Sequence, residues 1–395
     1  MIIGLEKYKR KWNIHTDSSI QPGLEAITSA LDELCNPHKN GRFIHLAGTN
    51  GKGSTATFLS AILQAHGYRV GNFYSPCIVD LHDQIQINGE PVSPSELDTV
   101  MERLSRVETP LTDFELLTAA AFIIFHQQNP DFAIIEAGMG GTLDSTNVII
   151  PDIAVIPSIS MEHTNFLGKT LEEIAHHKAG IIKKWKPVVV GELPDEAMQI
   201  VQETANRLHA ELIQSSAQKE VSLQLKGPHQ QKNAQLAMEA AKELLGLKFN
   251  EEMAQLGLSS ATLSYRFEEV FPDVIFDGAH NQASAEALVA TIKEAFPNCS
   301  IHIVMGIFKD KDYVTVLRQL ETVSDHFTFV DFENERALPA QTLFDESRSK
   351  RKTIAKHCDI LPVSDRKEKT IVTGSLYLLT ILRNSAHDFF KHYQV

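Results

Sequence analysis

The sequence has few of the features that mark secreted, membrane-spanning or disulfide-rich proteins. Its four cysteines, Cys35, Cys77, Cys299 and Cys358, form no C-x-x-C pair, which argues against a zinc site and a disulfide framework. No apolar run approaches membrane-spanning length, and charged residues interrupt the N-terminus before a signal-peptide core can form. We therefore expect a cytoplasmic protein that is neither exported nor embedded in a membrane.

Positive charge is also scarce. The chain has 37 Lys and Arg against 50 Asp and Glu, a net charge of −13, and so it lacks the basic footprint of nucleic-acid binding. Its 43% of hydrophobic and 22% of charged residues are those of an ordinary globular protein. A length of 395 residues exceeds one ordinary core and predicts two domains.

What the sequence does contain is a glycine loop at residues 48–55, which read Gly-Thr-Asn-Gly-Lys-Gly-Ser-Thr. A short apolar strand precedes the loop, and residues 56–65 carry apolar side chains at helical spacing. A strand, a glycine loop and a helix in this order bring backbone N–H groups and the helix N-terminus onto a polyphosphate. Lys52 would reach the terminal phosphates, and Ser54 or Thr55 would hold a magnesium ion.

This loop departs from the standard Walker pattern G-x-x-x-x-G-K-[ST]. Leu46 stands at the first glycine position, and Gly53 separates Lys52 from the first hydroxyl. A plain glycine turn between a strand and a helix is the alternative interpretation. The lysine, the two hydroxyls and the flanking elements favour nucleotide triphosphate binding, which we take as the working hypothesis.

Apolar strands alternate with helices along the chain, a pattern typical of parallel sheets covered on both faces. A helical lead-in is expected over residues 1–42, and residues 257–267 are interpreted as a linker between an N-terminal domain, 1–262, and a smaller C-terminal domain, 267–395. The predicted strands are 43–47, 68–74, 132–135, 153–156, 187–190, 274–276, 301–304, 327–330 and 370–372; the predicted helices include 56–65, 114–128, 171–182, 196–208, 230–245 and 283–296.

Several polar side chains follow these predicted strands. Ligands gather at the carboxyl ends of parallel strands, so the glycine loop, Ser75, Glu136 and the segment after Ser160 are expected to share one edge. A carboxylate such as Glu136 beside a phosphate loop is a natural magnesium ligand, although a solvated Glu in a glycine loop would look the same. His163 is alternatively a polar loop residue, and Lys178, on a helix, a snorkelling surface residue.

Six motifs occur in order: G-T-N-G-K-G-S, E-A-G-M-G-G-x-L-D-x-T-N, H-T-x-F-L-G, H-K-A-G-I-I-K, G-x-H-Q-x-x-N-A and D-G-A-H-N. Together they resemble folylpolyglutamate synthase/dihydrofolate synthase of the Mur ligase superfamily over roughly residues 20–380. The resemblance implies a P-loop ATPase-type α/β domain with a parallel sheet, followed by a smaller Rossmann-like α/β domain. It also implies ATP-dependent amide formation, in which a carboxylate takes the γ-phosphate and the amine of glutamate then displaces phosphate.

The same resemblance implies roles for residues by position, with ATP and Mg²⁺ as cofactors. Lys178 matches a lysine that the family carries as a carbamate, and Lys52, His163 and Lys178 are the implied catalytic residues. The implied ATP-binding residues are Asn50, Gly51, Lys52, Gly53, Ser54, Asn233, Arg266, Asp277, His280 and Asn281. The implied metal ligands are Ser54, Ser75, Glu136, His163 and Lys178, and the implied acceptor-binding residues are Thr112, Phe114, Glu115, Leu143, Asp144 and Ser145.

The departures from the family pattern fall mainly on the acceptor side. Cys77 replaces a usual His, and Gln84 and Thr142 replace usual arginines, which removes both charge and fork geometry. We therefore expect a monomeric ligase that adds glutamate to dihydropteroate, to a folate, or to both. A paralogue with another carboxylic acid acceptor, a P-loop kinase or GTPase, and a catalytically silent binding protein are the alternatives.

Overall fold

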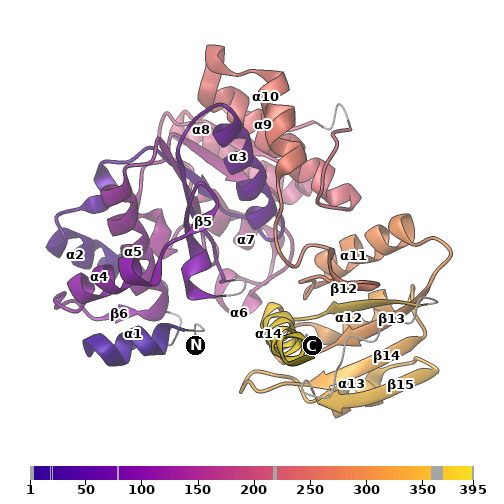
Figure 1. The fold of residues 1–395 in the computed structure, drawn as a ribbon. Coiled ribbons are helices and arrows are strands. Elements are labelled where there is room, and N and C mark those ends of the chain that lie inside the picture. Colours follow the sequence, from indigo (N-terminus) through magenta and orange to yellow (C-terminus); the bar gives the residue numbers. More distant parts are fainter. Residues whose placement is uncertain are drawn as a thin grey trace. The chain divides into compact units, whose positions relative to one another are not determined.

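The structure is a computed structural model that describes residues 4–17, 19, 21–77, 80–216, 220–356 and 368–393, with the side chains of the last helix described to residue 384. The chain divides into two compact units, each with its own sheet (Figure 1). The first unit comprises the described residues up to Gln224 together with Gln231–Ala261. The second comprises Leu225–Gln230 and the described residues from Thr262 onward, whereas the sequence places Leu225–Gln230 in the N-terminal domain.

The first unit is built on an eight-stranded sheet in the order β10-β9-β8-β2-β7-β3-β4-β5. The strands from β10 to β3 are parallel, and β4 and β5 extend one edge in antiparallel pairing. The central strands β2, β3, β7 and β8 are buried along their whole length because helices cover both faces. The strands are β2 Phe43–Leu46, β3 Val70–Phe73, β4 Ile85–Ile87, β5 Glu90–Pro91, β7 Phe132–Glu136, β8 Ile153–Ile156, β9 Val188–Val190 and β10 Leu212–Gln214.

Ten α-helices of the described residues belong wholly or mostly to this unit. Helix α10 packs against α3, as Figure 1 shows, and α5 is buried along most of its length. A separate pair of two-residue strands, β1 Thr16–Asp17 and β6 Leu111–Thr112, joins the N-terminal segment to the start of α5. The helices are α1 Leu5–Trp12, α2 Glu25–Glu33, α3 Lys52–Ala65, α4 Pro94–Leu104, α5 Asp113–Gln128, α6 Thr164–Leu167, α7 Leu171–Ala179, α8 Asp195–Leu208, α9 Pro228–Leu245 and α10 Glu251–Ser260.

Two sequence predictions need correction in this unit. The lead-in over residues 1–42 is not a continuous helical segment, because strand β1 separates α1 from α2. The predicted linker 257–267 is wrong at its start, because Gly257 lies inside α10. A Cβ on Gly257 would lie 2.5 Å from the carbonyl oxygen of Ala61, so this glycine allows α10 to lie directly on α3. A glycine that serves helix packing was thus interpreted as a helix end.

The second unit has a six-stranded sheet in the order β11-β12-β16-β13-β14-β15. All its strands are parallel except β11, which pairs antiparallel to β12. Strands β11 and β15 are absent from the sequence prediction, since charged residues begin both strands and β15 also ends in a lysine, which leaves no continuous apolar run. The elements are β11 Glu268–Phe271, β12 Val274–Phe276, α11 Gln282–Ala295, β13 Ser300–Met305, α12 Tyr313–Leu320, β14 His326–Asp331, α13 Ala340–Glu346, β15 Arg351–Lys356, β16 Glu368–Thr373 and α14 Leu376–Tyr393.

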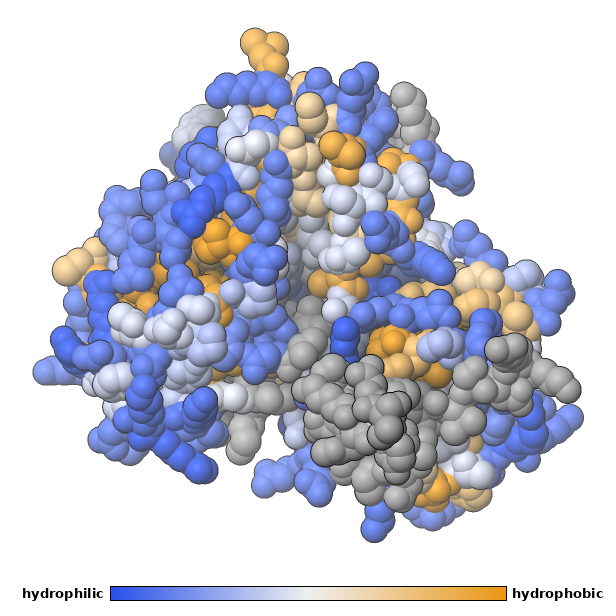
Figure 2. Space-filling model, viewed as in Figure 1, coloured by the Kyte–Doolittle hydropathy of each residue, from blue (hydrophilic) through white to orange (hydrophobic). Residues whose placement is uncertain are grey.

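Each unit has an apolar core between its sheet and its helices. Both units therefore confirm the predicted α/β class, with a parallel-sheet first unit and a smaller second sheet. On the face in view in Figure 2, apolar side chains occur in small groups among hydrophilic ones. None of the helices within the described residues is both long and apolar enough to cross a bilayer.

Candidate active site

The glycine loop connects β2 to α3 as the sequence predicts. Gly51 caps α3 with φ 84°, a left-handed conformation that favours glycine. A Cβ at this position would lie 2.5 Å from Oδ1 of Asn233. The Asn233 side chain, on α9, therefore lies directly against the glycine loop. The structure thus brings Asn233, a predicted nucleotide-binding residue, to the loop at residues 48–51, although 182 residues separate Asn233 from Gly51 (233 − 51).

The turn after β8 clamps this loop. The backbone N–H of Thr49 donates to the carbonyl of Ser158 at 2.8 Å, and the N–H of Asn50 donates to the Ser158 hydroxyl at 3.0 Å. The N–H of Ser160 donates back to the Thr49 hydroxyl at 3.0 Å. These bonds fix the loop's backbone in the absence of any contact with phosphate, so the cradle is formed in advance.

Lys52 lies folded over its own loop. Its ammonium donates to the carbonyl of Gly48 at 2.8 Å and also faces the carbonyl of Thr49. Ser54, in the first turn of α3, is 3% exposed. To reach a phosphate, Lys52 must exchange these carbonyl oxygens for phosphate oxygens, which are stronger acceptors because they are charged.

Glu136 ends β7 immediately beside the strand that leads into the glycine loop. It pairs in register with Leu46, and the N–H of Ala137 donates to the Leu46 carbonyl at 2.8 Å. Burial and the charge of Glu136 both raise the pKa of Tyr74, the residue before Ser75. Ser54, Ser75 and Glu136 therefore lie at or just beyond the carboxyl ends of β2, β3 and β7, which are neighbouring strands of the sheet.

Lys178 is buried and paired. Only 1% of its side chain is exposed, so the alternative of a snorkelling surface lysine is wrong. Its ammonium lies 2.5 Å from Oε1 of Glu162. Burial lowers the pKa of Lys178 to about 8, although the carboxylate of Glu162 opposes the shift. Lys52 contributes to the same shift, so the two lysines share an electrostatic environment.

For Glu162, nearby charges affect the pKa more than burial does. Burial alone would raise the pKa of its carboxyl group, but the charges of Lys178 and Lys52 outweigh burial and lower the pKa. His163, exposed and in a left-handed conformation with φ 45°, acts on Glu162 in the same direction and begins α6. The structure thus places two predicted catalytic lysines and His163 around one carboxylate that the sequence analysis did not select.

The loop after β7 is held by Asp144. One carboxylate oxygen of Asp144 accepts from the N–H of Met139 at 2.8 Å, and the other accepts from the N–H of Thr146 at 3.0 Å and from its hydroxyl. The Thr146 oxygen also lies 2.8 Å from Nε2 of His45, in the middle of β2. Because the single hydroxyl proton of Thr146 goes to Asp144, Nε2 of His45 must donate. This chain of bonds links the strand before the glycine loop to a predicted acceptor-binding loop.

The other predicted acceptor-binding residues lie at the start of α5 and on the loop after β7. Thr112 and Glu115 form a capping box, in which the Thr112 N–H donates to Oε2 of Glu115 at 2.8 Å. Phe114 stacks on Phe73 with ring centroids 5.9 Å apart. The Ser145 hydroxyl lies 3.0 Å from that of Thr118, and Leu143 is 42% exposed.

A cavity of about 680 Å³ opens between the N-terminal segment and the start of α5. The lining contains the carboxylates of Asp17, Glu25 and Glu115 but neither lysine nor arginine, as far as the structure describes the surrounding residues. Such a lining favours a ligand part that donates hydrogen bonds over an anionic one. The residues are His15, Thr16, Asp17, Gln21, Gly23, Glu25, Ala26, Pro110, Leu111, Thr112 and Glu115.

The second unit gathers the remaining predicted nucleotide-binding residues after β12. Asp277 accepts hydrogen bonds from the N–H groups of Phe267 at 2.9 Å and Ala279 at 3.0 Å. Burial raises the pKa of Asp277 to about 6, although Arg266 opposes the shift, so these two residues are neighbours. His280 donates from Nδ1 to the carbonyl of Gly278 at 2.8 Å, and Asn281 caps α11.

Sequence reasoning missed three residues of the first unit. Glu162 precedes the selected His163, and its polar position after β8 was the available signal. Ser158 lies in the same turn. His45 had no signal, because a histidine within an apolar strand is more often a core residue, and only the fold shows its bond to Thr146. The predicted residues Asn50, Gly53, Ser54, Ser75 and Glu136 lie along the edge formed by β2, β3 and β7.

The chain matches known protein families over most of its length. The Mur ligase middle domain matches residues 46–246, and the Mur ligase glutamate ligase domain matches residues 266–370. A dihydrofolate synthase/folylpolyglutamate synthase of Bacillus subtilis is 36% identical, over 92% of this chain and 95% of that protein. The chain belongs to the folylpolyglutamate synthase/dihydrofolate synthase family of Mur ligases. A dihydrofolate synthase/folylpolyglutamate synthase of Escherichia coli is 32% identical over 92% of this chain and 91% of that protein.

Solved structures of this family share the fold. A structure of Escherichia coli FolC in complex with DHPP and ADP has a TM-score of 0.87 at 28% identity and covers 98% of both chains. A bifunctional folylpolyglutamate synthase/dihydrofolate synthase with Mn, AMPPNP and L-glutamate bound has a TM-score of 0.84 at 30% identity and covers 94% of this chain and 95% of that chain. The chain is therefore an ATP-dependent ligase that works with a divalent cation, and the kinase and GTPase alternatives are wrong.

Proposed function

We propose that the chain attaches L-glutamate to dihydropteroate, to a folate, or to both, through an acyl phosphate. The observation that carries the proposal is the pairing of buried Lys178 with Glu162 close to Lys52 of the glycine loop. Related solved structures support the choice of substrates: one holds DHPP and ADP, and another holds Mn, AMPPNP and L-glutamate. The remaining residues are then assigned to nucleotide, metal and acceptor.

The nucleotide is assigned to the glycine loop. The hydrogen bonds to Ser158 and Ser160 fix the backbone of the loop, and the N-terminus of α3 that follows it is assigned to the triphosphate. Lys52 leaves the loop carbonyls and neutralises charge on the terminal phosphates, while Asn233 contacts the nucleotide from α9. In the second unit, Arg266 neutralises charge that develops during phosphoryl transfer, and Asp277 holds the turn that carries His280 and Asn281.

The residues present fit a magnesium ion. Ser54, Ser75 and Glu136 offer two hydroxyl oxygens and a carboxylate at one edge of the sheet, and Mg²⁺ prefers oxygen ligands together with phosphate. When bound there, the ion supplies charge neutralisation for the phosphates. We assign His163 to a second ion, because it lies beside the Lys178–Glu162 pair.

Lys178 is suited to become a carbamate. Only a neutral amine adds to CO₂, and burial lowers the pKa of Lys178 to about 8, so a larger fraction is neutral at neutral pH than for an ordinary lysine. The neutral amine nitrogen forms a bond to the carbon of CO₂ as one carbon–oxygen π bond opens, and the nitrogen loses one proton. Counted from the ammonium form, two protons are lost and the side chain changes from cationic to anionic. A fixed negative charge at this place holds the amine of glutamate for attack and offers oxygen ligands.

The chemical steps then balance. A carboxylate oxygen of the acceptor forms a bond to the γ-phosphorus, and the bond from this phosphorus to the β-bridging oxygen of ATP breaks, which releases ADP. The neutral amine of glutamate next attacks the acyl carbon, the carbon–oxygen bond to phosphate breaks, and the amine loses one proton. The products are an amide, ADP and inorganic phosphate. In this scheme the protein positions the reactants and stabilises charge.

Acceptor recognition is assigned to the cavity beside α5. Its carboxylates suit the amino and ring N–H donors of a pterin rather than an anionic tail. Gln84, which stands where the family usually has arginine, is buried, and its Oε1 has no hydrogen-bond partner within the described residues. Thr142, at the second usual arginine, donates to the carbonyl of His177 at 3.1 Å. These two positions supply no charge to the acceptor.

One assay tests the function. The purified chain is incubated with ATP, Mg²⁺ and L-glutamate, with either dihydropteroate or tetrahydrofolate, and phosphate release and product mass are followed. We expect phosphate release only when both glutamate and a pterin acceptor are present, with a product heavier by one glutamate residue. Phosphate release that depends on glutamate, although neither acceptor is converted, would instead assign the chain to the paralogue with a different carboxylic acid acceptor.

The monomeric state and the cytoplasmic location remain predictions, which light scattering and cell fractionation test.

A further inference from the structure

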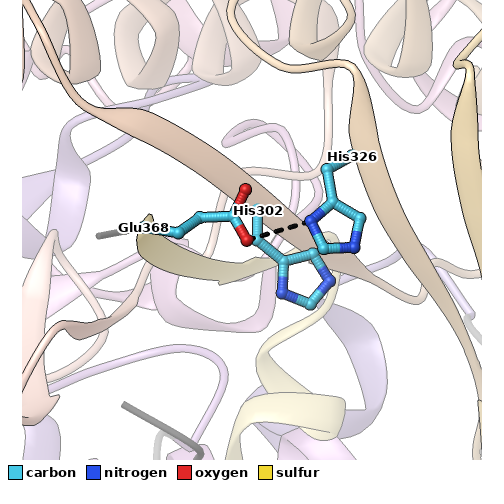
Figure 3. Close-up of side chains that lie close together, drawn as sticks. All are labelled: His302, His326 and Glu368. Carbon is cyan, nitrogen blue, oxygen red and sulfur yellow. Dashed lines mark hydrogen bonds and ion pairs between the residues drawn. The ribbon is translucent and has the colours of Figure 1, made fainter. Parts of the chain in front are cut away.

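Two histidines and a glutamate come together in the second unit, near the amino ends of the strands of its sheet, whereas Asp277 follows the carboxyl end of β12. His302 and His326 pair in register on β13 and β14, and Glu368 is the first residue of β16. Since β16, β13 and β14 are consecutive strands and Ser300 pairs with Glu368, all three side chains lie on one face, near the amino ends of the strands. Figure 3 shows the three side chains converging.

These side chains offer metal-ligating atoms within reach of one ion. One ligand atom from each of the three lies within 4.8 Å of the others. The cluster is half-buried, with 25% of the His326 side chain and 17% of the Glu368 side chain exposed. Nδ1 of His326 lies 3.0 Å from Oε2 of Glu368, so a cation that enters here replaces the proton between these two atoms.

A neighbouring hydroxyl orients one of the histidines. Nε2 of His302 lies 2.8 Å from the hydroxyl oxygen of Thr328, which in turn lies 3.1 Å from the hydroxyl of Thr353. When Nε2 donates to Thr328, Nδ1 carries the lone pair. Ligating histidines in metal sites generally donate their second ring N–H in this manner, which fixes the tautomer and the ring orientation.

Charged side chains surround the cluster. Glu368 and Asp325 are its carboxylates, and Arg351 lies between them, 2.9 Å from Asp325 and 3.5 Å from Glu368. Lys350 also acts on Asp325, so with neutral imidazoles these four charges sum to zero, and the case for a cation rests on the ligand atoms themselves.

We propose that His302, His326 and Glu368 form a binding site for Zn²⁺ or a similar late first-row divalent ion. Two imidazole nitrogens and one carboxylate are a zinc-type ligand set, whereas Mg²⁺ prefers oxygen ligands alone. The ion joins three neighbouring strands of the second sheet. It is distinct from the magnesium ions of the ligase reaction, and neither Lys178 nor Glu136 takes part in it.

The stacking of the His302 and His326 rings restricts how one metal ion can bind to both. The two imidazole rings stack with centroids 4.0 Å apart and an angle of 14° between their planes. A metal ion lies close to the plane of each ring that ligates it, so one ion cannot serve both rings while they are stacked. Binding therefore turns one ring out of the stack, and loss of the stacking is a structural mark of the occupied site.

Binding of Zn²⁺ to the full chain tests this proposal. Isothermal titration with ZnCl₂ is carried out without nucleotide, for the wild type, for the double variant His302→Gln/His326→Gln and for Thr328→Val. We expect one Zn²⁺ per wild-type chain, loss of this binding in the double variant, and roughly 10-fold weaker binding in Thr328→Val because the ligand orientation is lost. His126→Gln, at an exposed histidine of the first unit, is the matched control and binds as the wild type does.

A second measurement removes any dependence on variant folding. Crystals of the wild-type chain grown with Zn²⁺ should show an anomalous peak between the three side chains, with the rings no longer stacked, and no such peak with Mg²⁺ alone. Zn²⁺ binding that is equal in the double variant, or an anomalous peak only at the glycine-loop edge, would overturn the proposal. In that case the cluster is an ordinary ion pair between His326 and Glu368.

Discussion

The two units of this chain hold their candidate residues in different ways. In the first unit, side chains from distant segments pair with one another: Lys178 of α7 bonds to Glu162, and Asn233 of α9 lies against Gly51. In the second unit, the predicted nucleotide-binding residues bond to backbone groups: Asp277 accepts from the N–H of Ala279 in its own turn and from that of Phe267 before β11, and Asn281 caps the helix that follows it.

The candidate residues of the two units therefore differ in how strongly they depend on one another. The first unit contains an assembled network whose charges depend on one another, because Lys52 affects both Lys178 and Glu162. A substitution there changes several groups at once. In the second unit Asn281 bonds to the helix that it caps, so a substitution there acts locally. Substitutions in the first network should therefore cost more activity than equivalent substitutions in the second unit.

The largest effect is expected for Lys178→Ala. The change removes the buried amine and leaves Glu162 without its partner, so we expect turnover to fall by about 1,000-fold, the upper range for loss of one electrostatic group. Steady-state phosphate release measures it. Added short carboxylates should restore part of the activity, since they supply the negative charge of the carbamate. Lys169→Ala, at an exposed lysine before α7, is the control and should retain activity. Full activity in Lys178→Ala would remove the carbamate proposal.

A smaller effect is expected for Arg266→Ala in the second unit. Loss of the guanidinium removes charge that we assign to phosphoryl transfer, so kcat should fall by about 100-fold. Arg266→Lys should recover only part of this loss, because it keeps the charge without the planar fork. Arg351→Ala is the matched control in the same unit. An unchanged kcat in Arg266→Ala would show that the second unit takes no part in transferring phosphate.

The pH dependence of stability tests the buried link between β2 and the loop after β7. Burial lowers the pKa of His45 to about 3 from the ordinary value of 6.5, so the unfolded chain binds a proton that the folded chain does not. The contribution is therefore fully favourable above pH 6.5 and is lost as pH falls from 6.5 towards 3. In His45→Gln, which keeps a donor for Thr146, the slope of unfolding free energy should be smaller by up to about 1.4 kcal/mol per pH unit. Urea unfolding at several pH values measures it, and equal slopes would contradict the assignment.

The smallest effect is expected for Asn281→Ala. Its Oδ1 accepts from the N–H of Ser284 at 2.9 Å at the start of α11, and loss of such a cap costs about 1 kcal/mol of stability. Asn281→Ser should restore most of this stability. Denaturant unfolding measures both variants. A loss of several kcal/mol would mean that the second unit is as tightly coupled as the first.

The sequence predicts the parts of this site that lie along continuous segments. The order of strand, glycine loop and helix around Lys52 is local, and Glu136 ends an apolar strand whose length is readable from its residues. These features depend on neighbours within one or two turns, which sequence patterns record.

The remaining features depend on contacts between distant segments. His45 and Thr146 are 101 residues apart, and Lys178 and Glu162 are 16 apart in different loops and helices, so no local pattern marks either pair. Burial of Lys178 follows from how α7 lies against the sheet. Gly257 misled the prediction because a glycine that permits close helix packing and a glycine that ends a helix look the same in the sequence.

The most direct test of the ligase proposal follows one oxygen atom. The acceptor is prepared with ¹⁸O in its reacting carboxylate and is incubated with the chain, ATP, Mg²⁺ and L-glutamate, and the released phosphate is analysed by mass spectrometry. An acyl phosphate requires one carboxylate oxygen to leave with phosphate, so we predict one ¹⁸O in each phosphate from the fully labelled acceptor. Phosphate without label, formed together with the amide product, would contradict the mechanism.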